Sequence, residues 1–235
     1  GCGANLQGAR FEDVAPNVTV VPGPPEAVPR LVAGWVGDLG CAGPRPAFPR
    51  TRAYVKVQDG CSFTCSYCVI PQVRGASRSR EAGAVLADVA RRARQGHREV
   101  VLTGINLGCF RDRAAGMRLP DLLTAAARVE GIERVRLSSI EVNHVDDALL
   151  AAMAHRGVAR HLHVPMQSGD DGVLRAMRRR YTAGRFLSAM RRARERVAGV
   201  NLTTDVIVGH PAEDDAAFER TLAAVREVGF TRVHV

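Results

Sequence analysis

Short β-like runs alternate with amphipathic helical patterns over most of the chain. The alternation predicts strands over residues 54–58, 99–103, 134–138, 161–165, 202–208 and 231–235, and helices over residues 81–95, 119–130, 146–155, 170–197 and 213–228. In the first helix Val85, Leu86, Val89 and Ala93 form one apolar stripe, and Gly96 is a stop signal. This order predicts a parallel α/β sheet, either a partial (β/α)6 TIM-like barrel or an open doubly wound sheet.

Polar and glycine-containing segments follow the predicted strands and favour the barrel. They are residues 59–68, 104–106, 138–141, 167–169 and 209–213. Barrels of this class build their active sites from the loops that follow the carboxyl ends of several strands. No helical pattern follows residues 231–235, so we expect the barrel to be incomplete at its C-terminus.

Cys61, Cys65 and Cys68 have the spacing C-x3-C-x2-C in the first of these loops. Three thiolates so spaced can ligate three irons of a 4Fe-4S cluster and leave the fourth iron open to a small molecule. Structural zinc needs four N or S ligands, commonly in two pairs, and the sequence has no second C-x2-C or H-x3-H pair. The spacing favours the iron–sulfur cluster; zinc or three ordinary thiols are the alternatives.

Composition allows one sizeable core and suggests a polyanionic partner. The chain has 235 residues, 46% of them hydrophobic, and no run approaches the roughly 20 apolar residues of a membrane span. We expect no membrane partner, and reduced cysteines point to the cytoplasm. The net charge is +9, and nearly all the positive residues are arginines. They cluster at residues 74–80, 91–94, 175–180 and 191–196. These clusters favour RNA, although arginine runs on helices are also ordinary solvated faces.

The cysteine motif and its neighbouring segments, taken in order, resemble the methylthiotransferase branch of the radical S-adenosylmethionine enzymes. The segments are residues 51–61 (TRAYVKVQDGC), 69–71 (VIP), 78–80 (RSR), 103–108 (TGINLG), 161–169 (HLHVPMQSG) and 205–209 (DVIVG). The resemblance implies a radical-SAM barrel over residues 49–235, with a 4Fe-4S cluster on Cys61, Cys65 and Cys68. It also implies S-adenosylmethionine at the open iron, tRNA as a partner, and an electron donor such as flavodoxin or ferredoxin.

Two segments narrow the choice among the substrates of this family. Residues 138–141 (SSIE) and 177–182 (MRRRYT) look most like the members that add a 2-methylthio group to N6-threonylcarbamoyladenosine at position 37 of tRNA. Members that modify isopentenyladenosine in tRNA, or a ribosomal protein, remain alternatives. A different radical reaction on the same barrel, and a truncated protein that binds a cluster and RNA without turnover, also remain open.

The resemblance implies a set of residues that hold the cofactor: Gly104, Asn106, Ser139, Glu141, Gln167, Asp205 and Gly209. Gly104 is expected to let the backbone approach the cofactor closely. Glu141 and Gln167 are candidates for polar contacts to cofactor or substrate. As alternatives, Glu141 is a structural anion paired with an arginine, and Asp205 is a buried hydrogen-bond acceptor. We expect His161 and His163 to line the barrel, and Cys109 to be a spare thiol.

The N-terminal residues resemble the end of a preceding domain. Residues 1–3 (GCG) and 17–23 (NVTVVPG) lead into a stretch rich in Pro and Gly. We therefore expect residues 1–48 to be a remnant of the N-terminal α/β methylthiotransferase domain plus a linker. Cys2 would then ligate an auxiliary 4Fe-4S cluster, the second of two in the complete enzyme; an ordinary thiol is the alternative. One departure from the family is at residues 210–213, where HPAE replaces the usual FPGE, so His210 and Ala212 are expected to alter the hold on the adenine end of the cofactor.

Overall fold

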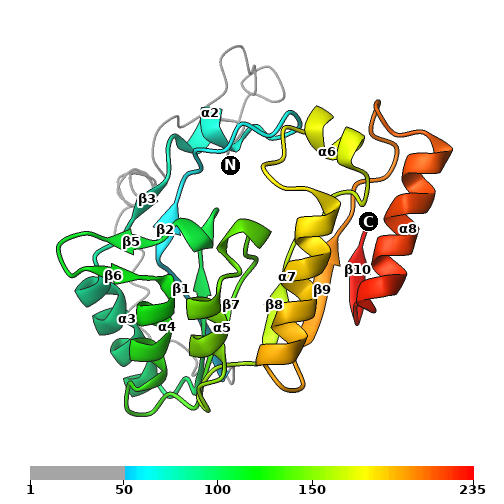
Figure 1. The fold of residues 1–235 in the computed structure, drawn as a ribbon. Coiled ribbons are helices and arrows are strands. Elements are labelled where there is room, and N and C mark those ends of the chain that lie inside the picture. Colours follow the sequence, from blue (N-terminus) through cyan, green and yellow to red (C-terminus); the bar gives the residue numbers. More distant parts are fainter. Residues whose placement is uncertain (1–50) are drawn as a thin grey trace, which may run out of the picture.

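The structure is a computed structural model that describes residues 51–235, and it contains six parallel strands in series (Figure 1). The expected roles of residues 1–48 and of Cys2 lie outside the described residues. The six strands are β1 (Arg52–Lys56), β4 (Glu99–Thr103), β7 (Arg134–Leu137), β8 (His161–His163), β9 (Asn201–Asp205) and β10 (Arg232–His234). The long helices between them are α3 (Ala82–Arg94), α4 (Leu119–Ala127), α5 (Asp147–Met153), α7 (Ala183–Arg196) and α8 (Asp215–Val228).

Shorter elements lie in the loops between the strands. They are the antiparallel pair β2 (Gln58–Asp59) and β3 (Arg78–Ser79), the antiparallel pair β5 (Arg111–Asp112) and β6 (Met117–Arg118), helices α2 (Ile70–Arg74) and α6 (Asp171–Ala176), and single 3-10 turns η3 (Leu107–Cys109) and η4 (Val142–His144). In the described part of the chain, no helix has both the length and the apolar character needed to cross a membrane.

The spatial order of the six strands is their order in the chain. Strand β4 pairs with β1 and β7, and β9 pairs with β8 and β10, always in parallel. Parallel bridges Val135↔Val158 and Ser139↔His163 join β7 to the β8 side, so the two three-stranded sheets form one curved series. A doubly wound sheet would reverse its strand order part-way. The partial barrel is therefore confirmed, and the doubly wound alternative is wrong.

Only one face of the curved sheet is apolar. The outer residues Val55, Leu102, Val135 and Leu162 are almost completely buried against the helices. Most residues on the inner face are polar or exposed, as in the pattern exposed–buried–exposed–buried–exposed along β1, and Val101 of β4 is a buried apolar exception. Since side chains alternate between the faces of a strand, the helices pack on the outside and the inner face is left for polar groups.

The helix expected over residues 170–197 is two helices, α6 and α7, and that expectation was wrong. Helix α6 ends because Arg178 adopts a left-handed conformation (φ 57°) and the Arg179 amide donates to the Leu174 carbonyl at 2.8 Å. This is the way that a glycine commonly ends a helix. Helix α7 restarts at Thr182, whose hydroxyl accepts from the Arg185 amide at 3.2 Å. An arginine gives no stop signal in the sequence, so the break was missed.

A buried carboxylate joins the first three strands at their amino-terminal ends. The parallel register places Arg52, Glu99 and Arg134 side by side on the inner face. The Glu99 carboxylate lies 2.9 Å from Arg52 Nε, 3.0 Å from Arg136 Nε and 3.7 Å from Arg134 Nη1. Burial raises the pKa of Glu99, but the hydrogen bond and charge of Arg136 and the charge of Arg52 outweigh it, and the pKa is lowered overall.

We expect Glu99→Gln to destabilise the chain by about 1–3 kcal/mol at pH 7, because three arginines would lose their shared partner while staying partly solvated. A lowered carboxyl pKa stabilises the fold above the unfolded pKa, and this contribution is lost as the pH falls through the folded pKa. Urea unfolding at several pH values between neutral and acid should therefore show the difference from wild type shrinking on acidification. Glu130→Gln, at an exposed site, is the control; a pH-independent deficit would contradict this account.

Candidate metal centre

The cysteine loop leaves β2 through a glycine that no other residue can replace without a shift. Gly60 has φ +67°, and a Cβ there would lie 2.2 Å from the Ala76 carbonyl oxygen. The Cys61 amide donates to the Gly75 carbonyl at 3.0 Å, and the Ser77 amide donates to the Ser62 hydroxyl at 3.1 Å. These two hydrogen bonds hold the loop against the segment before β3. Cys61, Cys65 and Cys68 are all free thiols of intermediate exposure on this one loop.

The buried side chain of Gln58 ties this loop to the end of β4. Its Nε2 donates to the Asp59 and Gly60 carbonyls, each at 2.7 Å, and lies 2.9 Å from the Ser77 hydroxyl. Its Oε1 accepts from the Asn106 amide at 2.8 Å. Gln58 is 1% exposed. One amide group therefore sets the position of both strand ends from which the cysteines and Asn106 project.

The close approach at Gly104 is to this glutamine. A Cβ at Gly104 would lie 2.8 Å from Gln58 Oε1 and 3.0 Å from Gln58 Cβ. The space that its missing side chain leaves is filled by Gln58. The close approach of a cofactor to the Gly104 backbone stays a prediction. The glycine is needed because two neighbouring strands meet over a buried amide.

Asp59, beside Gln58, collects three basic side chains under the loop. Its carboxylate accepts from the Gly60 amide at 2.8 Å and lies 3.3 Å from Arg74 Nη1, 3.2 Å from Arg78 Nη2 and 3.4 Å from Lys56 Nζ. Burial raises the pKa of Asp59. The Gly60 hydrogen bond and the charges of Lys56 and Arg74 lower it by more, so the pKa falls overall. The basic residues flanking the cysteine motif are thereby neutralised in part and held in place.

Arg179 reaches from the break between α6 and α7 to the cysteine loop. Its Nη1 lies 3.3 Å from Cys65 Sγ and 3.3 Å from the Tyr67 hydroxyl, and its Nη2 forms an ion pair with Glu141. The Arg179 side chain is 4% exposed and that of Glu141 is 20% exposed. The two segments that narrowed the substrate in the sequence, residues 138–141 and 177–182, therefore meet beside a cysteine.

The ionisation of this buried pair depends on Arg179. Burial raises the pKa of Glu141, and the Arg179 charge and hydrogen bond offset only part of the rise. Burial likewise lowers the pKa of Arg179, but Tyr181, Glu141 and Tyr67 raise it by more, so the guanidinium stays charged. Glu141 is paired with an arginine, which is the alternative that the sequence left open for this residue.

The other predicted cofactor residues lie at the same strand ends, in two further groups. Ser139 forms a parallel bridge with His163 at the β7–β8 junction. Gln167 has φ 64° and its amide donates to the Asp205 carbonyl at 2.9 Å. Asp205 is not a buried acceptor: its side chain is 41% exposed and lies 3.0 Å from His163 Nε2. That alternative for Asp205 was wrong, because the inner face is open at this strand end.

The segment after β9 carries the departure from the family pattern. The Gly209 amide, with φ 77°, donates to the Glu213 carboxylate at 2.6 Å. The Ala212 amide donates to His210 Nδ1 at 3.1 Å. The His210 ring therefore stabilises the turn that contains it, by accepting this hydrogen bond.

The comparisons with known proteins identify the family. The model of the radical SAM superfamily matches residues 55–225. The chain belongs to the radical SAM superfamily. Threonylcarbamoyladenosine tRNA methylthiotransferase MtaB of Chlamydia pneumoniae is 42% identical over 186 residues, 79% of this chain and 44% of that protein. MtaB of Thermotoga maritima is 42% identical over 188 residues, 79% of this chain and 43% of that protein.

A second group of relatives carries a different substrate in its name. tRNA-2-methylthio-N(6)-dimethylallyladenosine synthase of Pseudomonas fluorescens is 36% identical over 249 residues, 98% of this chain and 56% of that protein. The chain thus spans about half the length of the curated relatives that it matches.

Solved structures share the fold at low identity. The radical S-adenosylmethionine methyltransferase TsrM of Kitasatospora setae superposes with a TM-score of 0.65 at 19% identity, over 77% of this chain and 35% of that chain. SuiB of Streptococcus suis bound to the precursor peptide SuiA has a TM-score of 0.59 at 11% identity, over 92% of this chain and 45% of that chain. These likenesses confirm the radical-SAM barrel fold.

The residues of the loop fit the 4Fe-4S cluster that the superfamily implies. Three N–H groups point at its sulfurs: the Phe63 amide lies 3.4 Å and Asn106 Nδ2 3.8 Å from Cys61 Sγ, and Arg179 reaches Cys65. Hydrogen bonds to sulfur are one means by which proteins tune such clusters. Among residues 51–235, Asn106 Oδ1 is buried and has no hydrogen-bond partner, and a bound water or ion is one explanation for a buried polar atom of this kind.

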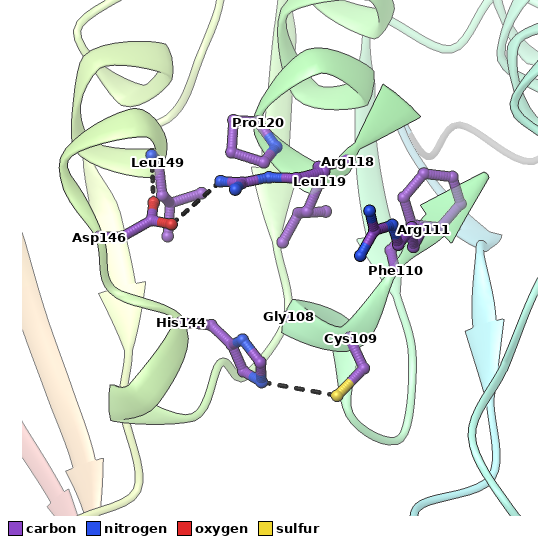
Figure 2. Close-up of a pocket in the computed structure, with 10 residues that line it drawn as sticks. All are labelled: Gly108, Cys109, Phe110, Arg111, Arg118, Leu119, Pro120, His144, Asp146 and Leu149. Atoms are coloured by element: carbon purple, nitrogen blue, oxygen red, sulfur yellow. Dashed lines mark hydrogen bonds and ion pairs between the residues drawn. The ribbon is translucent and has the colours of Figure 1, made fainter. Parts of the chain in front are cut away.

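Cys109 lines a pocket of about 250 Å³, drawn in Figure 2. Its Sγ lies 3.5 Å from His144 Nε2, while Arg118 pairs with Asp146 across the pocket. Burial raises the pKa of the Cys109 thiol, and nearby Cys61 adds to the rise. A thiol with a raised pKa is a poor nucleophile and a poor ligand, which agrees with a spare thiol at this position.

Sequence reasoning missed two residues of the site, Gln58 and Arg179. Gln58 lies inside the recognised motif without a role of its own, because an amide that satisfies backbone groups leaves no pattern. Arg179 lies in an arginine cluster that the sequence treated as helix surface or RNA contact. The motif 177–182 was the available signal, and the helix break is what turns this arginine inward.

We expect Gln58→Glu to destabilise the chain by about 3 kcal/mol, since a carboxylate would replace the Nε2 donor opposite two carbonyl oxygens and a hydroxyl. Anaerobic reconstitution should bind less iron per chain than wild type. Gln95→Glu makes the same chemical change at an exposed helix end and should leave stability and iron content unchanged. Wild-type iron content in Gln58→Glu would show that the amide does not organise the loop.

We expect Arg179→Ala to destabilise the fold by about 2 kcal/mol and to speed oxygen-driven loss of the cluster, because Glu141 would lose its cation and Cys65 a donor. Arg179→Lys should rescue only in part, since an ammonium lacks the planar fork. Iron content and the decay of cluster absorbance in air measure the effect. Arg175→Ala removes the same charge at an exposed position of α6 and should behave as wild type. Equal decay in the two alanine variants would refute the role of Arg179.

Proposed function

We propose that this chain is the radical-SAM part of a methylthiotransferase that adds a 2-methylthio group to N6-threonylcarbamoyladenosine at position 37 of tRNA. The support from relatives is the 42% identity to two proteins named for that substrate. The support from geometry is two contacts. Glu141 and Arg179, from the two segments that resemble this branch, form an ion pair, and Arg179 also contacts Cys65 of the cysteine loop.

The cofactors divide the chemistry with the protein. A 4Fe-4S cluster with S-adenosylmethionine supplies a 5′-deoxyadenosyl radical, which can abstract hydrogen from an unactivated carbon. In this proposal Cys61, Cys65 and Cys68 would hold the cluster, and the Phe63 amide, Asn106 and Arg179 would donate to the sulfurs of Cys61 and Cys65. Arg179 holds Glu141 beside the cysteine loop through their ion pair. Gln167, Ser139 and Gly209 line the other strand ends.

The partners follow from the same proposal. Exposed basic groups beside the loop suit an RNA backbone: Arg180 is exposed and lies 5.0 Å from the Phe63 ring centre. An electron donor such as flavodoxin or ferredoxin would reduce the cluster, and tRNA modification would place the protein in the cytoplasm. The auxiliary cluster, with Cys2 as one ligand, belongs to this proposal, and the match of a relative to 98% of the chain supports it.

The main alternative substrate is dimethylallyladenosine. It stands in the name of a relative that is 36% identical over 249 residues, a longer stretch than the MtaB matches cover. The same barrel is compatible with a different radical reaction, or with a protein that binds a cluster and RNA without turnover. The Glu141–Arg179 pair favours the threonylcarbamoyl substrate because both of its segments resemble that branch.

A chimera tests the substrate. Residues 51–235 would replace the matching segment of the Thermotoga maritima relative, and the reconstituted chimera would receive tRNA anticodon stem-loops carrying either modified adenosine. We expect 2-methylthio product on N6-threonylcarbamoyladenosine and no product from the Cys65→Ala chimera, measured by mass spectrometry of nucleosides. The chain alone should form 5′-deoxyadenosine without methylthiolated RNA.

Each other result has a distinct meaning. Product on dimethylallyladenosine alone would replace the substrate and keep the reaction class. Formation of 5′-deoxyadenosine by the chimera with neither RNA modified would contradict the methylthiotransferase proposal. Methylthiolated RNA from the chain alone would refute its dependence on flanking segments.

A further inference from the structure

Three potential metal ligands from neighbouring strands meet on the inner face of the barrel. They are His163 at the end of β8, Asp205 at the end of β9 and His234 at the end of β10. The register pairs His234 directly with Asp205, and His163 pairs with Thr203, two residues before Asp205. Residues two apart project on the same side of a strand, so the parallel register itself brings the three side chains together.

The distances are close to those of a coordination sphere. One ligand atom from each of the three residues lies within 4.8 Å of the other two. His163 Nε2 is 3.0 Å from Asp205 Oδ2, and the His163 and His234 rings meet edge to face with centroids 5.8 Å apart. Zinc bonds of 2.0–2.1 Å in a tetrahedron place ligands about 3.4 Å apart. His234 is exposed, which leaves its side chain room to move closer to the other two.

The neighbouring groups orient His163 as a ligand. Its Nδ1 lies 2.9 Å from the Thr203 hydroxyl, and that hydroxyl lies 3.2 Å from His161 Nε2. With the proton of His163 on Nδ1 and donated to Thr203, Nε2 carries a free lone pair that points toward Asp205. Metal-binding histidines are usually oriented in this way by a hydrogen bond to the second ring nitrogen.

The surroundings leave room for further ligands. The Asp205 side chain is 41% exposed and that of His163 is 19% exposed, so water reaches the cluster. Three protein ligands with open positions are the arrangement of a reactive metal site, whereas structural sites are closed. Two imidazoles and one carboxylate suit zinc, iron, cobalt or nickel better than magnesium or calcium, which prefer oxygen ligands.

We propose that His163, Asp205 and His234 bind a divalent first-row transition-metal ion such as Zn²⁺, at a site distinct from the cysteine loop. On binding, the metal takes the position between His163 Nε2 and the Asp205 carboxylate, and the single ring proton of His163 is on Nδ1, donated to Thr203. The remaining coordination positions face the interior of the barrel and accept water or an anionic oxygen of a substrate. The proposal is independent of which RNA the protein modifies.

Zinc stoichiometry of the cluster-loaded chain tests the site. After anaerobic reconstitution and removal of loose metal, we expect one Zn²⁺ per chain to bind in addition to the iron. Asp205→Asn keeps the shape of the side chain and should weaken Zn²⁺ binding at least about tenfold, as should His163→Ala and His234→Ala; Thr203→Val should weaken it about 10–100-fold. His155→Ala, a histidine outside the cluster, should bind as wild type, and thermal melting would confirm that each variant is folded.

Cobalt distinguishes these ligands from thiolates. In a chain with Cys61, Cys65 and Cys68 changed to alanine, Co²⁺ should give a visible spectrum without sulfur-to-cobalt charge transfer, and Asp205→Asn should abolish it. Zn²⁺ uptake that Asp205→Asn and His163→Ala leave unchanged would overturn the proposal. So would metal that binds only with the thiolate signature, or no uptake beyond iron, because His163 and Asp205 would then be a hydrogen-bonded pair only.

Discussion

The amide of Gln58 is the constraint on which the site depends. Its donor side satisfies the backbone where the cysteine loop begins, and its acceptor side holds the backbone at Asn106 after β4. A buried backbone group without a partner is costly, so the two strand ends cannot separate without losing these bonds. Gly104 follows from this arrangement, because any side chain there would collide with the glutamine.

The one-sided sheet then decides where chemistry is possible. Apolar side chains face the helices, and the inner face carries the Glu99 ion cluster at the amino-terminal ends and His163, Asp205 and the cysteine loop at the carboxyl ends. Charge at the amino-terminal ends is compensated by neighbours in register. At the carboxyl ends polar groups stay partly exposed, and this difference separates the part of the inner face that stabilises the barrel from the part available to ligands.

Arg179 shows how a local backbone feature alters a functional site. The left-handed Arg178 ends α6, and the following residues turn toward the cysteine loop. Had α6 and α7 been one helix, Arg179 would have been one of several arginines on a solvated face. The ion pair with Glu141 is therefore a product of the break, and the break has no glycine or proline to announce it.

The sequence by itself determined the order of the six strands, the parallel sheet and the cysteine motif, because each depends on spacing or periodicity along the chain. It also indicated the family, through the resemblance of several segments taken in order. All six inner-barrel strands lie at or within two residues of their expected positions at the start. Only the tertiary structure decided the roles of Gln58, Arg179 and Gly104 and the meeting of His163, Asp205 and His234. Those depend on contacts between residues far apart in the sequence, such as Gln58 with Asn106 and His163 with Asp205. The inward position of Arg179 also depends on a left-handed residue that propensity does not reveal.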